Sequence, residues 1–149
     1  MAEQQYVIFQ LGQETFALDI AKVWEIINFQ QITKVPQATE FIEGIINLRG
    51  KVIPVLDLRR RFGLSAVDDN KAMRIIVVEI AGHVTGLMVD GVSEVLRFSD
   101  EIVEAPPAAV TNVDEDFIEG VAKLQDRLII ILCIEKVLAS RNTDMSAAM

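Results

Sequence analysis

The residue types that most often carry out enzyme chemistry are sparse in this chain. His83 is the only histidine and Cys133 the only cysteine among 149 residues, so Ser-His-Asp or Cys-His catalysis would depend on one side chain. Zinc and redox-pair motifs lack a second cysteine. Neither GxGxxG nor GxxxxGK[ST], the loops that hold nucleotide phosphates, occurs in the sequence. We therefore predict a protein that is not an enzyme and has no catalytic residues, no metal site and no cofactor.

The remaining reactive or charged residues have a structural interpretation. His83 falls in a predicted turn, where it should be solvated, and Cys133 lies in the apolar run LIIILCI, where it should be a buried, inert thiol. The basic triplet Arg59 to Arg61 is typical of a solvated helix face. Arg49 lies in a mostly apolar neighbourhood, so it either pairs with a carboxylate such as Glu25 or is a solvated arginine at a hairpin tip.

Charge and hydropathy exclude two classes of partner. The chain has 14 Lys and Arg against 22 Asp and Glu, a net charge of -8, so it should repel nucleic-acid phosphates and anionic lipids. The run LIIILCI is seven residues long, where a membrane helix needs about twenty. The opening MAEQQ lacks the features of a secretion signal. We expect a cytoplasmic protein that neither binds nucleic acid nor inserts directly into a membrane.

The chain contains an internal duplication. FIEGIINLRGKVIPVLDL (Phe41 to Leu58) aligns without a gap to FIEGVAKLQDRLIIILCI (Phe117 to Ile134). Upstream, IFQLGQETFALDIAKVWEII (Ile8 to Ile27) aligns to VVEIAGHVTGLMVDGVSEVL (Val77 to Leu96). Since both copies share FIEG, we interpret this motif as mainly structural, with Phe and Ile in the core and Gly allowing the backbone to turn.

We predict five short strands in each copy. Valine, isoleucine, phenylalanine and threonine are frequent and glycines mark the turns, which favours strands over helices. In copy one the expected strands occupy 6–11, 15–20, 23–29, 44–48 and 51–57, with a turn at 12–14. Five such strands suffice for a small closed barrel. One domain over 1–149 would then contain a first barrel at about 6–62, a linker at 63–73, a second barrel at 74–140 and a flexible tail at 141–149.

The sequence resembles the CheW family, small adaptors of bacterial chemotaxis. The runs FALDIAKVWEII, FIEGIINLRGKVIPVLDLRRRF and GLMVDGVSEVL carry the resemblance, which extends from about Tyr6 to Ser140. It implies a mainly β fold of two pseudo-symmetric five-stranded SH3-like barrels packed side by side, with short helices. It also implies a non-enzymatic scaffold that couples transmembrane chemoreceptors to the histidine kinase CheA. The protein would be cytoplasmic and recruited to membrane receptor arrays.

The resemblance also implies two partner surfaces. The cytoplasmic tip of the chemoreceptors would bind a groove between the two barrels, formed by Ile20, Val23, Glu25, Ile26, Val92 and Val95. The regulatory CheW-like domain of CheA would contact the end of one barrel near Thr33, Glu43 and Gly44. Arg49, in the family's NLRG motif, would pair with Glu25 and brace the groove.

Two other functions are compatible with the same features. The chain could be an adaptor of the same fold in a chemosensory pathway unrelated to motility. It could also be a β-barrel that binds a small molecule, although the predicted interior is almost wholly apolar. Because the sequence contains no receiver, kinase or phosphotransfer segment, a standalone adaptor is the expected form.

Overall fold

The computed structural model describes residues 3–35, 42–64, 71–104, 117–124 and 126–138. Almost all of the regular structure is β-strand, as predicted. None of the helices within these ranges is long and apolar enough to cross a membrane. The elements, in chain order, are β1 (Glu3–Leu11), β2 (Glu14–Asp19), the 3-10 helix η1 (Ile20–Lys22), β3 (Val23–Asn28), β4 (Ile42–Leu48), β5 (Lys51–Asp57), α1 (Leu58–Arg61), β6 (Arg74–Ile80), β7 (His83–Val89), β8 (Gly91–Ser99), η2 (Asp100–Ile102), β9 (Val103–Glu104), β10 (Ile118–Leu124), β11 (Arg127–Leu132) and a last helix at 134–138.

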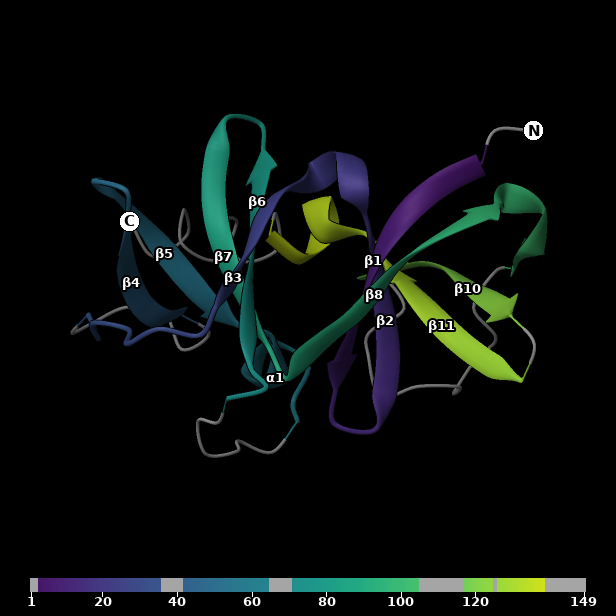
Figure 1. Cartoon of the computed structure of the whole chain (residues 1–149), viewed down its shortest axis with the longest axis horizontal. Coiled ribbons are helices and arrows are strands. Elements are labelled where there is room, and N and C mark those ends of the chain that lie inside the picture. Colours follow the sequence, from purple (N-terminus) through teal and green to yellow (C-terminus); the bar gives the residue numbers. More distant parts are fainter. Residues whose placement is uncertain (1–2, 36–41, 65–70, 105–116, 125, 139–149) are drawn as a thin grey trace.

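The strands form two curled sheets that lie side by side (Figure 1). One has six strands in the order β8-β1-β2-β11-β10-β9, and the other five in the order β3-β6-β7-β5-β4. The expected closed barrels are not fully formed in the described ranges. In the five-stranded sheet, the segment that follows β3 meets the edge strand β4 through an isolated bridge between Thr33 and Ile45.

The sheets do not follow the two sequence copies, so the expected division into a barrel at 6–62 and a barrel at 74–140 is corrected. Strands β1 and β2 of copy one complete the sheet that contains β8 to β11 of copy two. Conversely, β6 and β7 of copy two lie inside the sheet built from β3, β4 and β5. The two copies therefore exchange strands with each other.

The connector lengths explain this exchange. Only Asp90 separates β7 from β8. If β8 occupied the place beside β6 that β3 holds, Val92 would lie opposite Val78, as Val23 does. Val78 pairs with Thr85, four residues before Val89, the last residue of β7. Val89 and Val92 would then be about 17 Å apart, four residues along the strands and two strand spacings across them, whereas three Cα steps reach at most about 11 Å. The chain must therefore continue directly into the other sheet.

Burial on both faces of the central strands explains why the strands are so apolar. Along β1, Val7 and Phe9 join a cluster between the sheets, called the inter-sheet cluster, whereas Tyr6 and Ile8 join the core of the six-stranded sheet. Strand β6 alternates in the same way between the inter-sheet cluster and the core of the five-stranded sheet. The helix at 134–138 lies between the sheets in Figure 1, and Val137 in it is fully buried.

The two FIEG glycines have a different role from the predicted turn. In both copies the register of the hairpin shifts at this position, at Gly44 in β4 and at Gly120 in β10. A Cβ atom on Gly44 would lie 2.2 Å from the Thr33 carbonyl oxygen, and one on Gly120 would lie 2.5 Å from a methyl carbon of Val103. Each glycine is thus required because the segment that follows the edge strand packs directly on it.

Candidate protein-interaction site

Four of the five apolar residues predicted for receptor binding lie on two edge strands that border the same seam, and the fifth, Ile20, lies in η1. Val23 and Ile26 on β3 pair across the ladder with Val78 and Ile76. On β8, Val92 and Val95 pair with Phe9 and Val7. Directly paired residues share a face of the sheet, and all four partners belong to the inter-sheet cluster. The two edge strands therefore extend the apolar seam between the sheets towards the surface.

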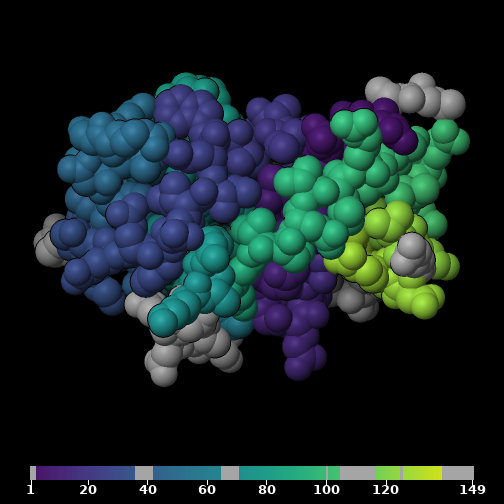
Figure 2. Space-filling view, in the orientation of Figure 1, coloured from purple at the N-terminus to yellow at the C-terminus, as the bar shows by residue number. Residues whose placement is uncertain are grey.

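This seam leaves large apolar side chains in contact with solvent. The exposed fraction is 36% for Ile20, 38% for Ile26 and 47% for Val95. Val23 and Val92 are half-buried against the inter-sheet cluster. Figure 2 shows β8, in green, and the residues around β3, in indigo, on the face turned towards the viewer. We call the apolar residues predicted to bind the receptor the receptor face: Ile20, Val23, Ile26, Val92 and Val95.

Glu25 does not share this face. Its ladder partner is Val77, which belongs to the core of the five-stranded sheet, because the register shifts between Val23 and Glu25. Glu25 instead forms an ion pair with Arg49 at the tip of the β4–β5 hairpin. Of the two alternatives for Arg49, the structure has the ion pair, and its backbone has a positive φ of 51°.

A repeat-equivalent ion pair was not foreseen from the sequence. Glu94, which aligns with Glu25, binds Arg127 at 3.1 Å between Nη1 and Oε2. Arg127 aligns with Lys51 and not with Arg49, so comparing only identical positions misses it. Lys51 itself lies over the Trp24 ring, with its Nζ 5.3 Å from the ring centroid.

The three residues predicted for the kinase contact are brought together at the opposite edge of the five-stranded sheet. Thr33 donates its N–H to the Ile45 carbonyl at 2.9 Å and accepts the Ile45 N–H at 2.8 Å. Gly44 lies beneath this bridge. Glu43 accepts a hydrogen bond from Arg60 at 2.8 Å and lies 3.7 Å from Lys34 Nζ.

The basic triplet is not the solvated face that was expected. The guanidinium of Arg59 forms two hydrogen bonds with the Asp90 carboxylate, of 2.8 and 2.6 Å, and its side chain is only 12% exposed. Arg60 binds Glu43, and Arg61 lies 4.5 Å from the Phe117 ring centroid. In α1, which begins at Leu58 with Asp57 as its N-cap, Arg59 and Arg61 are therefore partly buried, whereas Arg60 is exposed.

The Arg59–Asp90 pair joins the two sheets. Asp90 also accepts the N–H of Gly12, in the β1–β2 turn, at 2.7 Å, and it donates its own N–H to the Gln10 carbonyl at 3.0 Å. A helix that follows β5 is thereby tied to the crossing between β7 and β8 and to a turn of the other sheet.

A second ion pair joins Lys22 of η1 to Glu135 of the last helix. Cys133 lies beside it, with Sγ 3.9 Å from Glu135 Oε1. The Cys133 side chain is half-buried rather than buried as predicted, whereas His83 is exposed as predicted.

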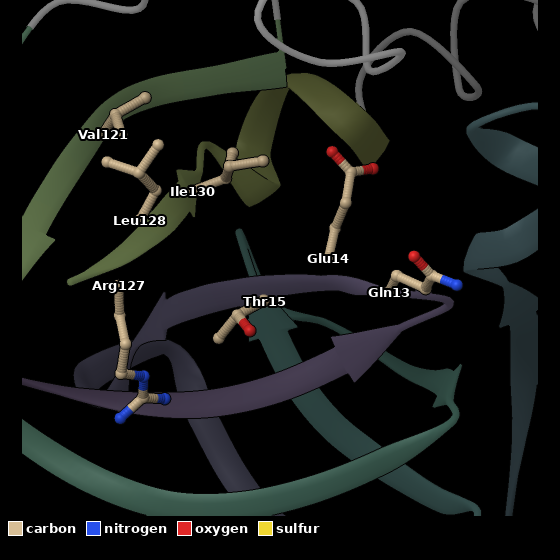
Figure 3. A pocket seen from close by; sticks show the side chains of 7 residues that line it. All are labelled: Gln13, Glu14, Thr15, Val121, Arg127, Leu128 and Ile130. Carbon is tan, nitrogen blue, oxygen red and sulfur yellow. The ribbon is translucent and has the colours of Figure 1, made fainter.

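Two surface clefts are lined by residues outside the receptor face. The larger, of about 310 Å³, lies between the β1–β2 turn and the β10–β11 hairpin (Figure 3). Its lining combines the apolar Val121, Leu128 and Ile130 with the polar Gln13, Glu14, Thr15 and Arg127. The other, of about 220 Å³, adjoins the Lys22–Glu135 pair. Within the described ranges, no cluster of three or more His, Cys, Asp or Glu side chains is arranged to hold a metal ion.

The two inter-sheet ion pairs should make the stability depend on pH. Burial raises the pKa of Asp90, but hydrogen bonds from Arg59 and Gly12 and the charge of Arg59 outweigh it and leave the pKa below its usual value. A hydrogen bond from Lys22 lowers the pKa of Glu135. A depressed carboxyl pKa contributes stability above the unfolded value, about 4, which is lost as the pH falls through the folded value.

We therefore expect the free energy of unfolding to fall progressively below about pH 5 in urea titrations at a series of pH values. Asp57 has the opposite sign, because burial raises its pKa and so its protonation favours the folded state. An Asp90→Asn variant should show a smaller decrease than the wild type, since it no longer has this carboxylate to protonate. An unchanged slope in the variant would contradict the assignment to Asp90.

Comparison with known proteins agrees with this architecture. A family model described as "CheW-like domain" matches residues 5–142. The chain is 36% identical to the Chemotaxis protein CheW of Klebsiella aerogenes, over 92% of this chain and 82% of that protein. It is 34% identical to the Chemotaxis protein CheW of Thermotoga maritima, over 93% and 89% of the two chains.

Among solved structures, the scaffolding protein TtCheW from Thermoanaerobacter tengcongensis superposes with a TM-score of 0.81. The two sequences are 48% identical, and the match covers 89% of this chain and 85% of that one. Both the sequence and the two-sheet fold therefore match over nearly the whole length of the chain. The chain belongs to the CheW-like domain family of chemotaxis scaffold proteins.

Proposed function

We propose that this protein is a non-enzymatic adaptor that couples chemoreceptors to the histidine kinase CheA in the cytoplasm, at membrane receptor arrays. Membership of the CheW-like family supports the adaptor role. The observation that carries the proposal further is the apolar receptor face, because exposed apolar side chains continuous with a core commonly mark protein-interaction surfaces.

The receptor face suits a helical partner. Four of its apolar side chains come from two strands on either side of one seam, and Ile20 comes from η1. An amphipathic helix can lay its apolar stripe into such a seam, with side chains spaced three and four residues apart as anchors. The cytoplasmic tip of a chemoreceptor, a helical hairpin, provides such a stripe. In this proposal the Arg49–Glu25 pair braces β3 from its other face, so it supports the contact without touching the receptor.

The kinase contact is proposed at the opposite edge of the same sheet. Thr33, Glu43 and Gly44 lie together there, so a scaffold could hold both partners at once. Lys34 is exposed in this region, with 77% of its side chain accessible. Charged residues at such a rim mainly affect association rate and specificity.

The test is calorimetric titration of the full chain with two partners from the same organism, the CheA regulatory domain and a soluble receptor-tip fragment. Val95→Arg should weaken receptor binding at least tenfold, because it places a charge in an apolar contact, and should leave kinase binding unchanged. Lys34→Glu should do the reverse. Both positions are exposed, so circular dichroism should show wild-type folding for each variant.

The matched control is Val52→Arg, since Val52 is 62% exposed but lies outside the receptor face. Equal losses from Val95→Arg and Val52→Arg would mean that the receptor contact is not at this seam. Absence of heat from the wild type with both partners, at several temperatures, would contradict the adaptor function itself.

A further inference from the structure

The two crossings between the sheets are each held by an ion pair to a helix. The crossing after β7 carries Asp90, which binds Arg59 of α1. The crossing after β2 is η1, whose Lys22 binds Glu135 of the last helix. Helix α1 follows β5, which pairs in parallel with β7, the strand that leads into the first of these crossings. The last helix follows β11, which pairs in parallel with β2, the strand that leads into the second. The same device therefore occurs twice.

The charges of this device are opposite in the two copies. Arg59 and Glu135 occupy equivalent positions, since the gapless alignment that matches the two FIEG motifs matches these residues as well. On the crossings, Lys22 and Asp90 lie one residue apart in the alignment of the copies. In copy one the paired helix residue Arg59 and the paired crossing residue Lys22 are both positive, whereas in copy two the corresponding residues, Glu135 and Asp90, are both negative.

This arrangement makes each copy complementary to the other and repulsive to itself. The strand exchange brings Arg59 of copy one to Asp90 of copy two, and Glu135 of copy two to Lys22 of copy one. If two chains instead exchanged strands like with like, Arg59 of one chain would approach Lys22 of the other. Likewise, Glu135 in copy two of one chain would approach Asp90 in copy two of the other. Such like-charge contacts oppose association.

We propose that the opposite polarity of these two ion pairs selects which copies exchange strands, so that copy one pairs with copy two of its own chain and not with copy one of a second chain. Because the connectors are short, each copy has to exchange strands with another copy. Because the two copies share a fold, a copy from a second chain could take the place of the other copy in the same chain. Specificity of this kind commonly comes from a repulsive element as much as from an attractive one.

The test uses the full chain with Lys22→Glu and Glu135→Lys combined. This variant keeps an ion pair between η1 and the last helix, with the two charges exchanged. The wild-type side chains are 38% and 43% exposed, so the monomer should still fold. It reverses the polarity, so that position 22 becomes attractive to Arg59 and position 135 to Asp90 in a like-with-like dimer. After refolding from denaturant at several protein concentrations, the dimer-to-monomer ratio in light-scattering chromatography should rise about tenfold over the wild type.

The matched control is Lys22→Ala combined with Glu135→Ala, which removes the native pair without creating an attraction between like copies. Because it also removes the like-charge repulsion, its ratio should lie between that of the wild type and that of the reversed variant. A dimer formed by strand exchange should also persist on dilution, because it separates only by unfolding. Should the reversed variant fail to fold, Glu135→Lys alone provides the same attraction to Asp90 and should form the same dimer.

Three results would overturn the proposal. The reversed variant could refold at the wild-type ratio. The alanine variant could dimerise to the same extent, in which case loss of the native pair is the cause. The dimer could dissociate at once on dilution, as a surface association does.

Discussion

Replacing Gly44 with alanine is expected to lower the free energy of unfolding by about 3 kcal/mol, the upper part of the range for overpacking a close contact. The added Cβ would lie 2.2 Å from the Thr33 carbonyl oxygen. That oxygen cannot move away independently, since it accepts the Ile45 N–H while Thr33 donates to the Ile45 carbonyl. Urea unfolding followed by circular dichroism would measure the loss.

The second FIEG motif provides a graded comparison. Gly120→Ala should cost less, about 1 to 2 kcal/mol, because its nearest neighbour is a methyl carbon of Val103 rather than a backbone atom. Gly91→Ala is the control, with its nearest contact at 3.4 Å, and should cost less than about 1 kcal/mol. A cost for Gly44→Ala no greater than that for Gly91→Ala would show that the close approach is not rigid.

This result also affects how the kinase contact is tested. A substitution at Gly44 would displace Thr33, so weaker kinase binding could follow from the altered strand edge rather than from a lost contact. Lys34→Glu acts on the same region from an exposed side chain. For this reason the binding experiment relies on Lys34.

Replacing Arg59 with methionine is expected to lower the free energy of unfolding by about 2 to 3 kcal/mol. Removing one member of a fully buried pair costs about 3 to 5 kcal/mol, because the remaining charge is left without a partner. Here the side chains of Arg59 and Asp90 are 12% and 21% exposed, so solvent reduces the cost. Methionine preserves most of the apolar contact, so the loss reports on the ion pair.

Arg60→Met is the matched control on the same helix. Its side chain is 42% exposed, so the expected cost is about 1 kcal/mol or less. A double-mutant cycle of Arg59→Met with Asp90→Asn should show that the two substitutions together cost less than the sum of the single ones. Additive costs would mean that the two residues act independently.

The family, the mainly β fold and the adaptor role were predictable from sequence because they depend on local patterns. Apolar strands, turn glycines and motifs such as INLRG are read along the chain. The apolar residues proposed to bind the receptor were chosen in the same way, through positions that match a family motif, and their role stays a prediction. Of that set, Glu25 was placed with the groove, whereas the register shift in β3 turns it towards Arg49.

The strand exchange was not predicted because duplication indicates similar units without indicating which strands pair. The information was present in the one-residue connector between β7 and β8, but its meaning depends on the strand order. Arg59 was missed for a related reason. Its partner Asp90 belongs to the other copy, and a basic triplet after a strand gives no indication of a carboxylate 31 residues away.

The short crossing at Asp90 also bears on how such a fold could arise. A single copy with the same connectors could not complete either sheet by itself, so two separate copies would have had to assemble as an interlocked pair. Joining the two copies in one chain replaces that encounter with an intramolecular one that does not depend on protein concentration. Within one chain, neither copy has to be complementary to itself, which is compatible with the opposite charges at their crossings.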